Sequence, residues 1–342
     1  MGVQRAAYPI RIQSRHIDMR QLPRKDDLTI CFCHVAYRMA ERFALRGTGI
    51  NHFQVATADE LAARISEADV VSVSMAWRNA MIEHAPKLAF VQSISAGTDQ
   101  YDKDKFKAAG IRLASAQGAN ANAVAQHAMA LMLALVRQLH LARDNQAKRH
   151  WRGMISDIAQ REDELGGKTL LIVGFGHIGA RLAALAKAFG MRVIALKRDP
   201  STSIGTADAV LPQDRLLEQL PTADYVALTC PLTRETERMI NAQALAAMKP
   251  SAFLINVARG RVVDEPALTA ALVEKGIAGA GIDCTVEEPL PAFSPLWGFD
   301  NALITPHTAG ETRRYEDNVI DLLLENLDRL WRGETVLKNQ VV

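Results

Sequence analysis

The sequence has little cysteine, a nearly balanced charge and no long apolar run. Its four cysteines form no C-x-x-C pair, which argues against a disulfide scaffold and a zinc site. Lysine and arginine number 40 against 38 acidic residues, and a net charge of +2 argues against binding nucleic acid through its phosphates. The longest strongly apolar stretch, 128–136, is far shorter than the roughly 20 residues of a membrane span. We therefore expect a cytoplasmic protein that holds no metal and binds neither nucleic acid nor a membrane.

The first 27 residues are rich in arginine and contain no acidic residue before Asp18. Such a composition can be that of a transit peptide. Tyr8, Ile10 and Ile12 occupy alternate positions, a pattern that also fits an extra strand or an arm that crosses to a second subunit. These alternatives stay open.

Apolar runs alternate with helix-period segments from residue 28 onward. The first series predicts strands over 28–33, 69–74, 88–93 and 111–114, with a helix over 36–45. One long helix is predicted over 122–148. Strands separated by helical stretches are typical of βαβ units and a parallel sheet.

A second series begins after Gly166 and Gly167 and predicts six strands with helices between them. The strands are expected over 169–173, 193–196, 225–229, 253–257, 280–283 and 303–305, and the helices over 178–189, 214–219, 242–248 and 265–275. This is the pattern of a doubly wound domain, whose first turn carries the ligand. The final helix, 315–332, could pack on either domain.

A glycine-rich turn follows the first strand of the second series and precedes an alanine-rich helix. It has the G-x-G-x-x-G form and consists of Gly174, Phe175, Gly176, His177, Ile178 and Gly179. The first glycine allows the tight turn, the second lets the backbone approach a pyrophosphate, and the third lets the helix pack on the strand. Because the helix also directs the positive end of its dipole at the turn, a dinucleotide cofactor is predicted.

The residues after the next strand bear on which dinucleotide binds. An acidic residue at this place would accept a hydrogen bond from the ribose 2′-hydroxyl of NAD, but this strand ends in Lys197 and Arg198. Two cations would pair well with a 2′-phosphate, so we expect NADP. The alternative is NAD, with Asp199 reaching back to the ribose.

Three loops that follow neighbouring predicted strands carry a guanidinium, a carboxylate and an imidazole, those of Arg259, Glu288 and His307. Ligands of α/β sheets bind at the carboxyl ends of the strands, so these side chains should share one rim. Beside a nicotinamide they would be catalytic. Arg261 is the competing arginine, and we expect one of the two to face solvent.

From about residue 28 onward the chain resembles the D-isomer-specific 2-hydroxyacid dehydrogenase family. The motifs that carry the resemblance are V-G-F-G-H-I-G, C-P-L-T-R-E-T at 230–236, N-V-A-R-G-R-V-V-D-E at 256–265, D-C-T-V-E-E-P-L-P at 283–291 and T-P-H-T-A-G at 305–310. The resemblance implies an α/β fold with a Rossmann dinucleotide-binding domain over 118–307. This domain would be inserted into a smaller flavodoxin-like substrate domain built from 1–117 and 308–342. A homodimer through the Rossmann domains is also implied.

The same resemblance assigns the site residues. It identifies the catalytic residues as Arg259, Glu288 and His307. Beyond the glycine-rich turn and the two cations, it implies cofactor contacts at Cys230, Pro231, Val257, Ala258, Arg259, Asp283 and His307, with Asp283 toward the nicotinamide carboxamide. Substrate contacts are implied at Ser95, Ala96, Gly97, Arg259 and His307.

These assignments describe an enzyme that interconverts a small 2-oxo acid and its D-2-hydroxy acid. His307 would exchange a proton with the substrate oxygen, Glu288 would fix the tautomer of that ring, and Arg259 would polarise the 2-oxo group. We expect a glyoxylate or hydroxypyruvate reductase. The far wall of its substrate pocket is expected near residues 75–78 and Trp297. The alternatives are a phosphoglycerate dehydrogenase-like enzyme and a non-enzymatic, corepressor-like dinucleotide sensor.

Overall fold

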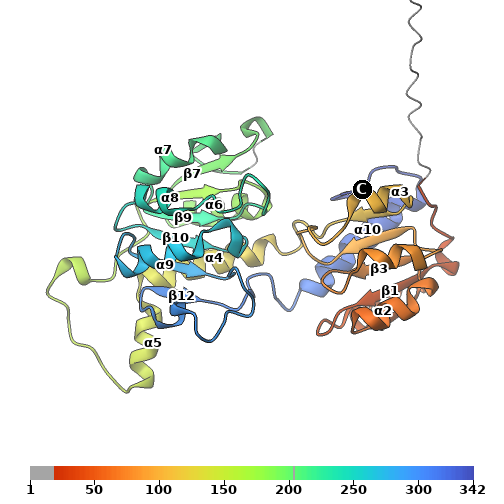
Figure 1. The fold of residues 1–342 in the computed structure, drawn as a ribbon, viewed down its shortest axis with the longest axis horizontal. Coiled ribbons are helices and arrows are strands. Elements are labelled where there is room, and N and C mark those ends of the chain that lie inside the picture. The colour runs from red at the N-terminus through yellow and green to blue at the C-terminus, as the bar shows by residue number, and fades with distance from the viewer. Residues whose placement is uncertain (1–18, 203–204) are drawn as a thin grey trace, which may run out of the picture. The chain divides into compact units, whose positions relative to one another are not determined.

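The computed structural model describes residues 19–202 and 205–342 and divides the chain into two compact units (Figure 1). The first unit combines the chain up to Ala116 with Glu316–Val342, and the second is Gln117–Tyr315. The N-terminal pattern of Tyr8, Ile10 and Ile12, whether transit peptide, strand or arm, lies outside the described residues.

The first unit contains a parallel sheet in the order β2-β1-β3-β4-β5, which is the flavodoxin-like order. Its strands are β1 (Thr29–Cys33), β2 (Asn51–Val55), β3 (Val70–Val73), β4 (Phe90–Ser93) and β5 (Arg112–Ala114). Its helices are α1 (Met39–Ala44), α2 (Ala58–Arg64), α3 (Lys103–Ala108) and most of α10 (Tyr315–Trp331). The final helix therefore packs here, where the buried Asn326 amide donates to Gln92 Oε1 of β4 at 3.0 Å.

The second unit contains a parallel sheet in the order β12-β11-β10-β9-β6-β7-β8, which is a doubly wound order. Its strands are β6 (Thr169–Val173), β7 (Arg192–Lys197), β8 (Ala209–Pro212), β9 (Tyr225–Leu228), β10 (Phe253–Asn256), β11 (Gly279–Ile282) and β12 (Ala302–Ile304). Its helices are α4 (Ala121–Val136), α5 (Leu139–Ala147), α6 (His177–Ala188), α7 (Leu216–Gln219), α8 (Ala242–Ala247) and α9 (Glu265–Val273). The fold class predicted from the sequence is confirmed.

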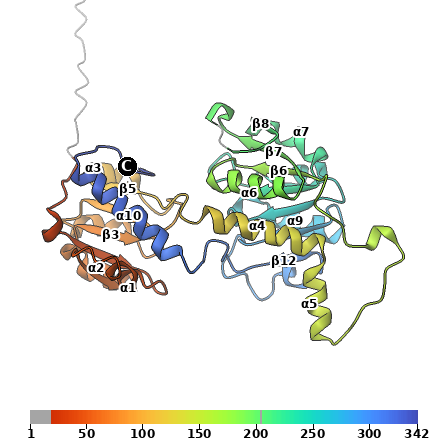
Figure 2. The same cartoon turned by 180° about the vertical axis from the view of Figure 1, so that it is seen from behind.

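Helices cover both faces of the seven-stranded sheet, with α8 and α9 on one face (Figure 1) and α4 and α6 on the other (Figure 2). On β6, Leu171 and Val173 enter the core under α8 and α9, whereas Leu170 and Ile172 enter the core under α4 and α6. Successive strand side chains point to opposite faces, so a strand covered on both faces is apolar throughout.

The long helix predicted over 122–148 is wrong, because the chain forms two helices, α4 and α5. Gln138, between them, has a left-handed φ of 49° that ends the regular helix. The His140 ring then contacts the carbonyl oxygens of Ala134 and Asp300 at 3.2 and 3.0 Å and holds α5 in its new direction. No glycine or proline marks the break, so the sequence carried no signal for it.

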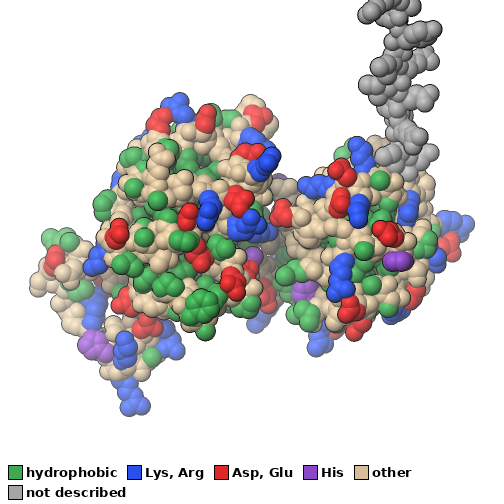
Figure 3. Space-filling model, in the orientation of Figure 1, with side chains coloured by type: hydrophobic (Ala, Val, Ile, Leu, Met, Phe, Trp, Pro, Cys, Tyr) green, Lys and Arg blue, Asp and Glu red, His purple; other side chains and the backbone are tan. Residues whose placement is uncertain are grey.

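Over the described ranges, no helix combines the length and apolarity that a membrane span requires. The same residues contain no cluster of three or more metal-ligating side chains. Figure 3 shows basic and acidic side chains interspersed on the visible face of both units.

Candidate active site

The three glycines of the turn after β6 have different surroundings. A Cβ atom at Gly174, where φ is 98°, would overlap the backbone of Cys230, and a Cβ at Gly179 would overlap the carbonyl oxygen of Gly174. A Cβ at Gly176 would meet nothing within 4 Å. The outer two glycines are therefore required by packing inside the protein, whereas the middle one faces open space.

This open space lies at the N-terminus of α6. Gly176 is the N-cap residue, and no side chain caps the first turn of the helix. Uncapped amides at a helix N-terminus, together with the helix dipole, favour an anion. The Phe175 side chain is buried while His177 is exposed. The turn fits a dinucleotide pyrophosphate.

At the end of β7 the two expected cations have different environments. Lys197 Nζ donates to the Thr202 carbonyl at 2.6 Å, while Arg198 is exposed. Asp199 Oδ1 accepts from both the hydroxyl and the amide of Ser201, at 2.6 and 3.1 Å, and these bonds lower the pKa of the Asp199 carboxyl. Arg198 is thus presented to solvent, and Asp199 is engaged with its neighbour.

The loops after β9 and β10 carry Cys230, Pro231, Val257 and Ala258. Pro231 is exposed and the other three are buried. Burial raises the pKa of the Cys230 thiol to about 11, so it stays protonated at neutral pH. Cys230 acts as packing for the glycine-rich turn rather than as a nucleophile.

His307 and Glu288 form a direct pair. His307 Nδ1 lies 2.8 Å from Glu288 Oε2, and both side chains are partly exposed. The other carboxylate oxygen, Oε1, accepts from the Thr285 amide at 3.1 Å, so the carboxylate has a fixed orientation. A carboxylate on Nδ1 leaves Nε2 of the imidazole for a further partner.

Arg259, on the loop after β10, is half-buried, with Nη1 donating to the Ala258 carbonyl at 2.7 Å. A Cβ at the next residue, Gly260, would overlap the Thr285 carbonyl, so the loops that carry Arg259 and Glu288 touch through their backbones.

The surroundings of the buried Cys284 thiol shift its pKa. Burial raises the pKa of Cys284, the negative charges of Asp283 and Glu288 raise it further, and Arg259 opposes them. The competing arginine, Arg261, is exposed and lies 2.6 Å from the carboxylate of Glu237.

Asp283 holds the loop that contains His307. Its buried carboxylate accepts from Thr305 Oγ1 at 2.6 Å and from the amides of Thr308 and Ala309 at 3.1 Å. His307 has a left-handed φ of 54°, a conformation that costs a non-glycine residue about 1 kcal/mol. Hydrogen bonds on both sides of His307 therefore stabilise an unfavourable backbone conformation. Asp283 is the residue predicted to contact the nicotinamide carboxamide. Both of its carboxylate oxygens accept hydrogen bonds from the loop that contains His307.

Sequence reasoning assigned no role to His127 or Thr305. His127, on α4, places Nε2 2.9 Å from Thr305 Oγ1. The two residues are 178 positions apart, and the fold of the second unit brings them together. A histidine inside an apolar helix carries no local signal of such a contact.

The predicted substrate loop, Ser95–Gly97, follows β4 in the first unit. The amide of Ser95 donates to Ser93 Oγ at 3.1 Å, and the hydroxyl oxygen of Ser95 lies 2.5 Å from Ser74 Oγ. Within the described part of the chain, the amides of Ala96 and Gly97 donate no hydrogen bond, and Ala96 is exposed. The loop therefore presents two free amides.

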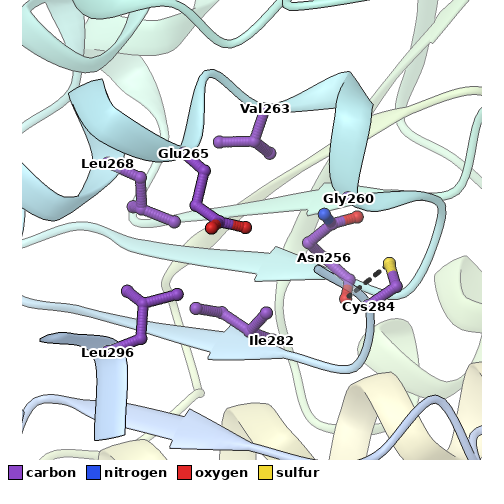
Figure 4. Close-up of a pocket in the computed structure, with 8 residues that line it drawn as sticks. All are labelled: Asn256, Gly260, Val263, Glu265, Leu268, Ile282, Cys284 and Leu296. Carbon is purple, nitrogen blue, oxygen red and sulfur yellow. Dashed lines mark hydrogen bonds between the residues drawn. The ribbon is translucent and has the colours of Figure 1, made fainter. Parts of the chain in front are cut away.

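A small cavity lies in the second unit, beside Gly260 and Cys284 (Figure 4). It is lined by Asn256, Gly260, Val263, Glu265, Leu268, Ile282, Cys284 and Leu296. Its charged residue, Glu265, already accepts from the Val286 amide at 2.9 Å. Arg259, Glu288 and His307 do not line this cavity, which is a packing space behind the site.

The chain is similar to several known proteins. Residues 129–309 match the family model described as D-isomer specific 2-hydroxyacid dehydrogenase, NAD binding domain. A glyoxylate reductase of Pyrococcus furiosus is 36% identical over 296 residues, which cover 83% of this chain and 86% of that protein.

The chain is also similar to a dehydrogenase of known name and to a reductase of known structure. A D-3-phosphoglycerate dehydrogenase of Escherichia coli is 37% identical over 243 residues, covering 70% of this chain and 58% of that protein. An NADPH-dependent glyoxylate/hydroxypyruvate reductase of Sinorhizobium meliloti, solved with NADP and malonate, has a TM-score of 0.75 and 26% identity. That alignment covers 92% of this chain and 97% of the other.

Proposed function

We propose a function from the premise that the chain belongs to the D-isomer specific 2-hydroxyacid dehydrogenase family: it is an NAD(P)-dependent oxidoreductase that reduces glyoxylate, hydroxypyruvate or a related small 2-oxo acid to the corresponding 2-hydroxy acid. The product has the D configuration where C2 is a stereocentre. The observation that carries this proposal is the His307–Glu288 pair at 2.8 Å, with Arg259 on the adjoining loop. A proton donor, a carboxylate that orients it and a cation for the developing negative charge can together support reversible reduction of a carbonyl.

Each side chain has a defined task in this proposal. His307 Nε2 donates a proton to the carbonyl oxygen, while Glu288 holds Nδ1 and fixes the tautomer. Arg259 pairs with the substrate carboxylate and stabilises the negative charge that develops on the 2-oxo group. In the first unit, the free amides of Ala96 and Gly97, with Ser95 beside them, are the proposed contacts for a substrate carboxylate. When bound, the nicotinamide would supply a hydride for C2 of the substrate.

The remaining predicted contacts form the coenzyme site in this proposal. The glycine-rich turn binds the pyrophosphate, and Cys230, Pro231, Val257 and Ala258 line the loops beside the nicotinamide half of the coenzyme. Asp283 holds the His307 loop in position through its hydrogen bonds to Thr308 and Ala309.

We propose NADP as the preferred coenzyme, because Arg198 is exposed at the end of β7 and Asp199 is engaged with Ser201. Arg198→Ala is expected to lower kcat/KM for NADPH by about 10- to 100-fold, the loss of one charge-assisted phosphate contact. The value for NADH should change less than about twofold. Arg192→Ala, at the opposite end of β7, is the matched control. An equal loss with both coenzymes would refute the 2′-phosphate role and favour NAD.

We propose a substrate without a phosphate group rather than phosphoglycerate. Of residues 75–78, Trp77 is buried in the core of the first unit, and Arg78 Nη1 is paired with Asp59 Oδ1 at 2.7 Å. Met75, which follows β3, is 95% exposed. Residues 75–78 therefore offer an apolar thioether and an arginine paired with an acidic residue, which supports a substrate without a phosphate group.

We further propose a homodimer through the second unit. The segment after α5 exposes Trp151 (96%), Met154 (99%) and Ile158, and Figure 3 shows hydrophobic side chains on this projecting part. Large apolar side chains at full exposure are typical of an interface with another chain. A cytoplasmic location is proposed because all four cysteines are free and buried thiols.

Initial rates of NADPH and NADH oxidation with glyoxylate, hydroxypyruvate and 3-phosphohydroxypyruvate test the proposal. We expect turnover of the first two substrates with a preference for NADPH. Faster turnover of the phosphorylated substrate would favour a phosphoglycerate dehydrogenase-like enzyme. Coenzyme binding without turnover of any 2-oxo acid would favour the dinucleotide sensor.

A further inference from the structure

The contact between α4 and the His307 loop has a defined direction of hydrogen bonding. Thr305 Oγ1 lies 2.6 Å from Asp283 Oδ1, and a carboxylate can only accept, so the hydroxyl gives its single hydrogen to Asp283. The oxygen of Thr305 must then accept at its other contact, with His127 Nε2 at 2.9 Å. The chain of donors therefore runs from His127 to Thr305 to Asp283, and Nε2 of His127 carries a hydrogen.

The acceptor at the end of this chain is buried. Only 2% of the Asp283 side chain is exposed, and His127 Nε2 lies 3.4 Å from Oδ1, close to the bond from Thr305. A buried carboxylate needs donors to offset the loss of water. His127 and Thr305 form one side of this donor set, and the amides of Thr308 and Ala309 form the other.

We propose that His127 is a positioning residue, which acts through Thr305 and Asp283 to hold His307 in its left-handed conformation at the site. His127 touches neither His307 nor Glu288 in the described contacts, and three-quarters of its side chain is buried. A proton donor must be aligned with the substrate oxygen, and a displacement of about 1 Å can lower the rate by about 100-fold. This inference rests on the proposed function for its catalytic consequence, but not for its structural one.

Two pairs of substitutions separate the hydrogen-bond chain from simple packing. His127→Leu removes the donor, whereas His127→Gln keeps an N–H at a similar reach. Thr305→Val removes the hydroxyl, and Thr305→Ser keeps it. We expect kcat to fall about 10- to 100-fold in the Leu and Val variants, with the Kd for coenzyme unchanged, and to recover largely in the Gln and Ser variants. The double variant His127→Leu/Thr305→Val should lose little more than the worse single variant, because both break one chain.

Hydrogen exchange supplies a readout that does not depend on turnover. The amides of Thr308 and Ala309 should exchange at least about 10-fold faster in the Leu and Val variants than in the Gln and Ser variants. If no 2-oxo acid is reduced but this difference appears, the proposed function fails and the positioning inference stands.

Wild-type exchange in every variant, or a kcat within twofold of wild type in His127→Leu and Thr305→Val, would overturn the inference. A Gln variant that folds but loses as much activity as the Leu variant would also overturn it. If His127→Leu does not fold, the comparison of Thr305→Val with Thr305→Ser tests the inference by itself.

Discussion

Replacement of His307 by alanine is expected to lower kcat for 2-oxo acid reduction by about 1,000-fold or more, because it removes the proton donor. Glu288 would lose its partner at 2.8 Å, yet both side chains are partly exposed, so the fold should persist. The Kd for NADPH should change by less than about threefold, since the glycine-rich turn and Arg198 lie on other loops. Single-turnover rates and fluorescence titration measure the two quantities.

His84→Ala is a suitable control for the loss of an imidazole. The His84 side chain is exposed in the first unit and makes no hydrogen bond in the described part of the chain. Its activity should match that of the parent protein. If His307→Ala kept more than a tenth of the parent kcat, another group would have to supply the proton, and the assignment of His307 would be wrong.

Replacement of Arg259 by alanine is expected to lower kcat/KM by about 1,000-fold or more. The guanidinium pairs with the substrate carboxylate and also stabilises the negative charge that grows in the transition state. The alanine variant therefore loses both substrate binding and transition-state stabilisation. Arg259→Lys should recover only part of the loss, because an ammonium keeps the charge but not the planar two-pronged donor.

The neighbouring arginine offers a matched control two residues away. Arg261 is exposed and paired with Glu237, and a surface pair of this kind contributes at most about 1 kcal/mol to stability. Arg261→Ala should therefore keep kcat/KM within about twofold of the parent value. Equal losses in the two alanine variants would contradict the assignment of catalysis to Arg259.

Most strands of both sheets could be predicted from the sequence, including β5 and β12, which each form one edge of a sheet. The strands that sequence reasoning missed are β2 and β8, which form the opposite edges. β2 has three polar residues among its five, and β8 ends in Pro212, which cannot donate to a sheet ladder, so neither strand has the sequence pattern of a central strand. Central strands such as β6 and β9 were found because both of their faces are buried.

The candidate site was predictable to the extent that single loops define it. Arg259, Glu288 and His307 each lie in a loop directly after a strand, where sequence order alone indicates a common rim. The hydrogen bonds among His127, Thr305 and Asp283 join a helix to two strand ends, and their geometry depends on how α4 packs on the sheet. The left-handed backbone at His307 likewise has no signal in its residue type, because glycine would be expected there.

The central claim is reduction of a 2-oxo acid to the D-2-hydroxy acid at a site formed by Arg259, Glu288 and His307. The most direct test is the product formed from hydroxypyruvate with NADPH, separated by chiral chromatography. We predict D-glycerate as the product, formed in step with NADPH oxidation and absent in His307→Ala. L-glycerate, or NADPH oxidation without glycerate, would contradict the account.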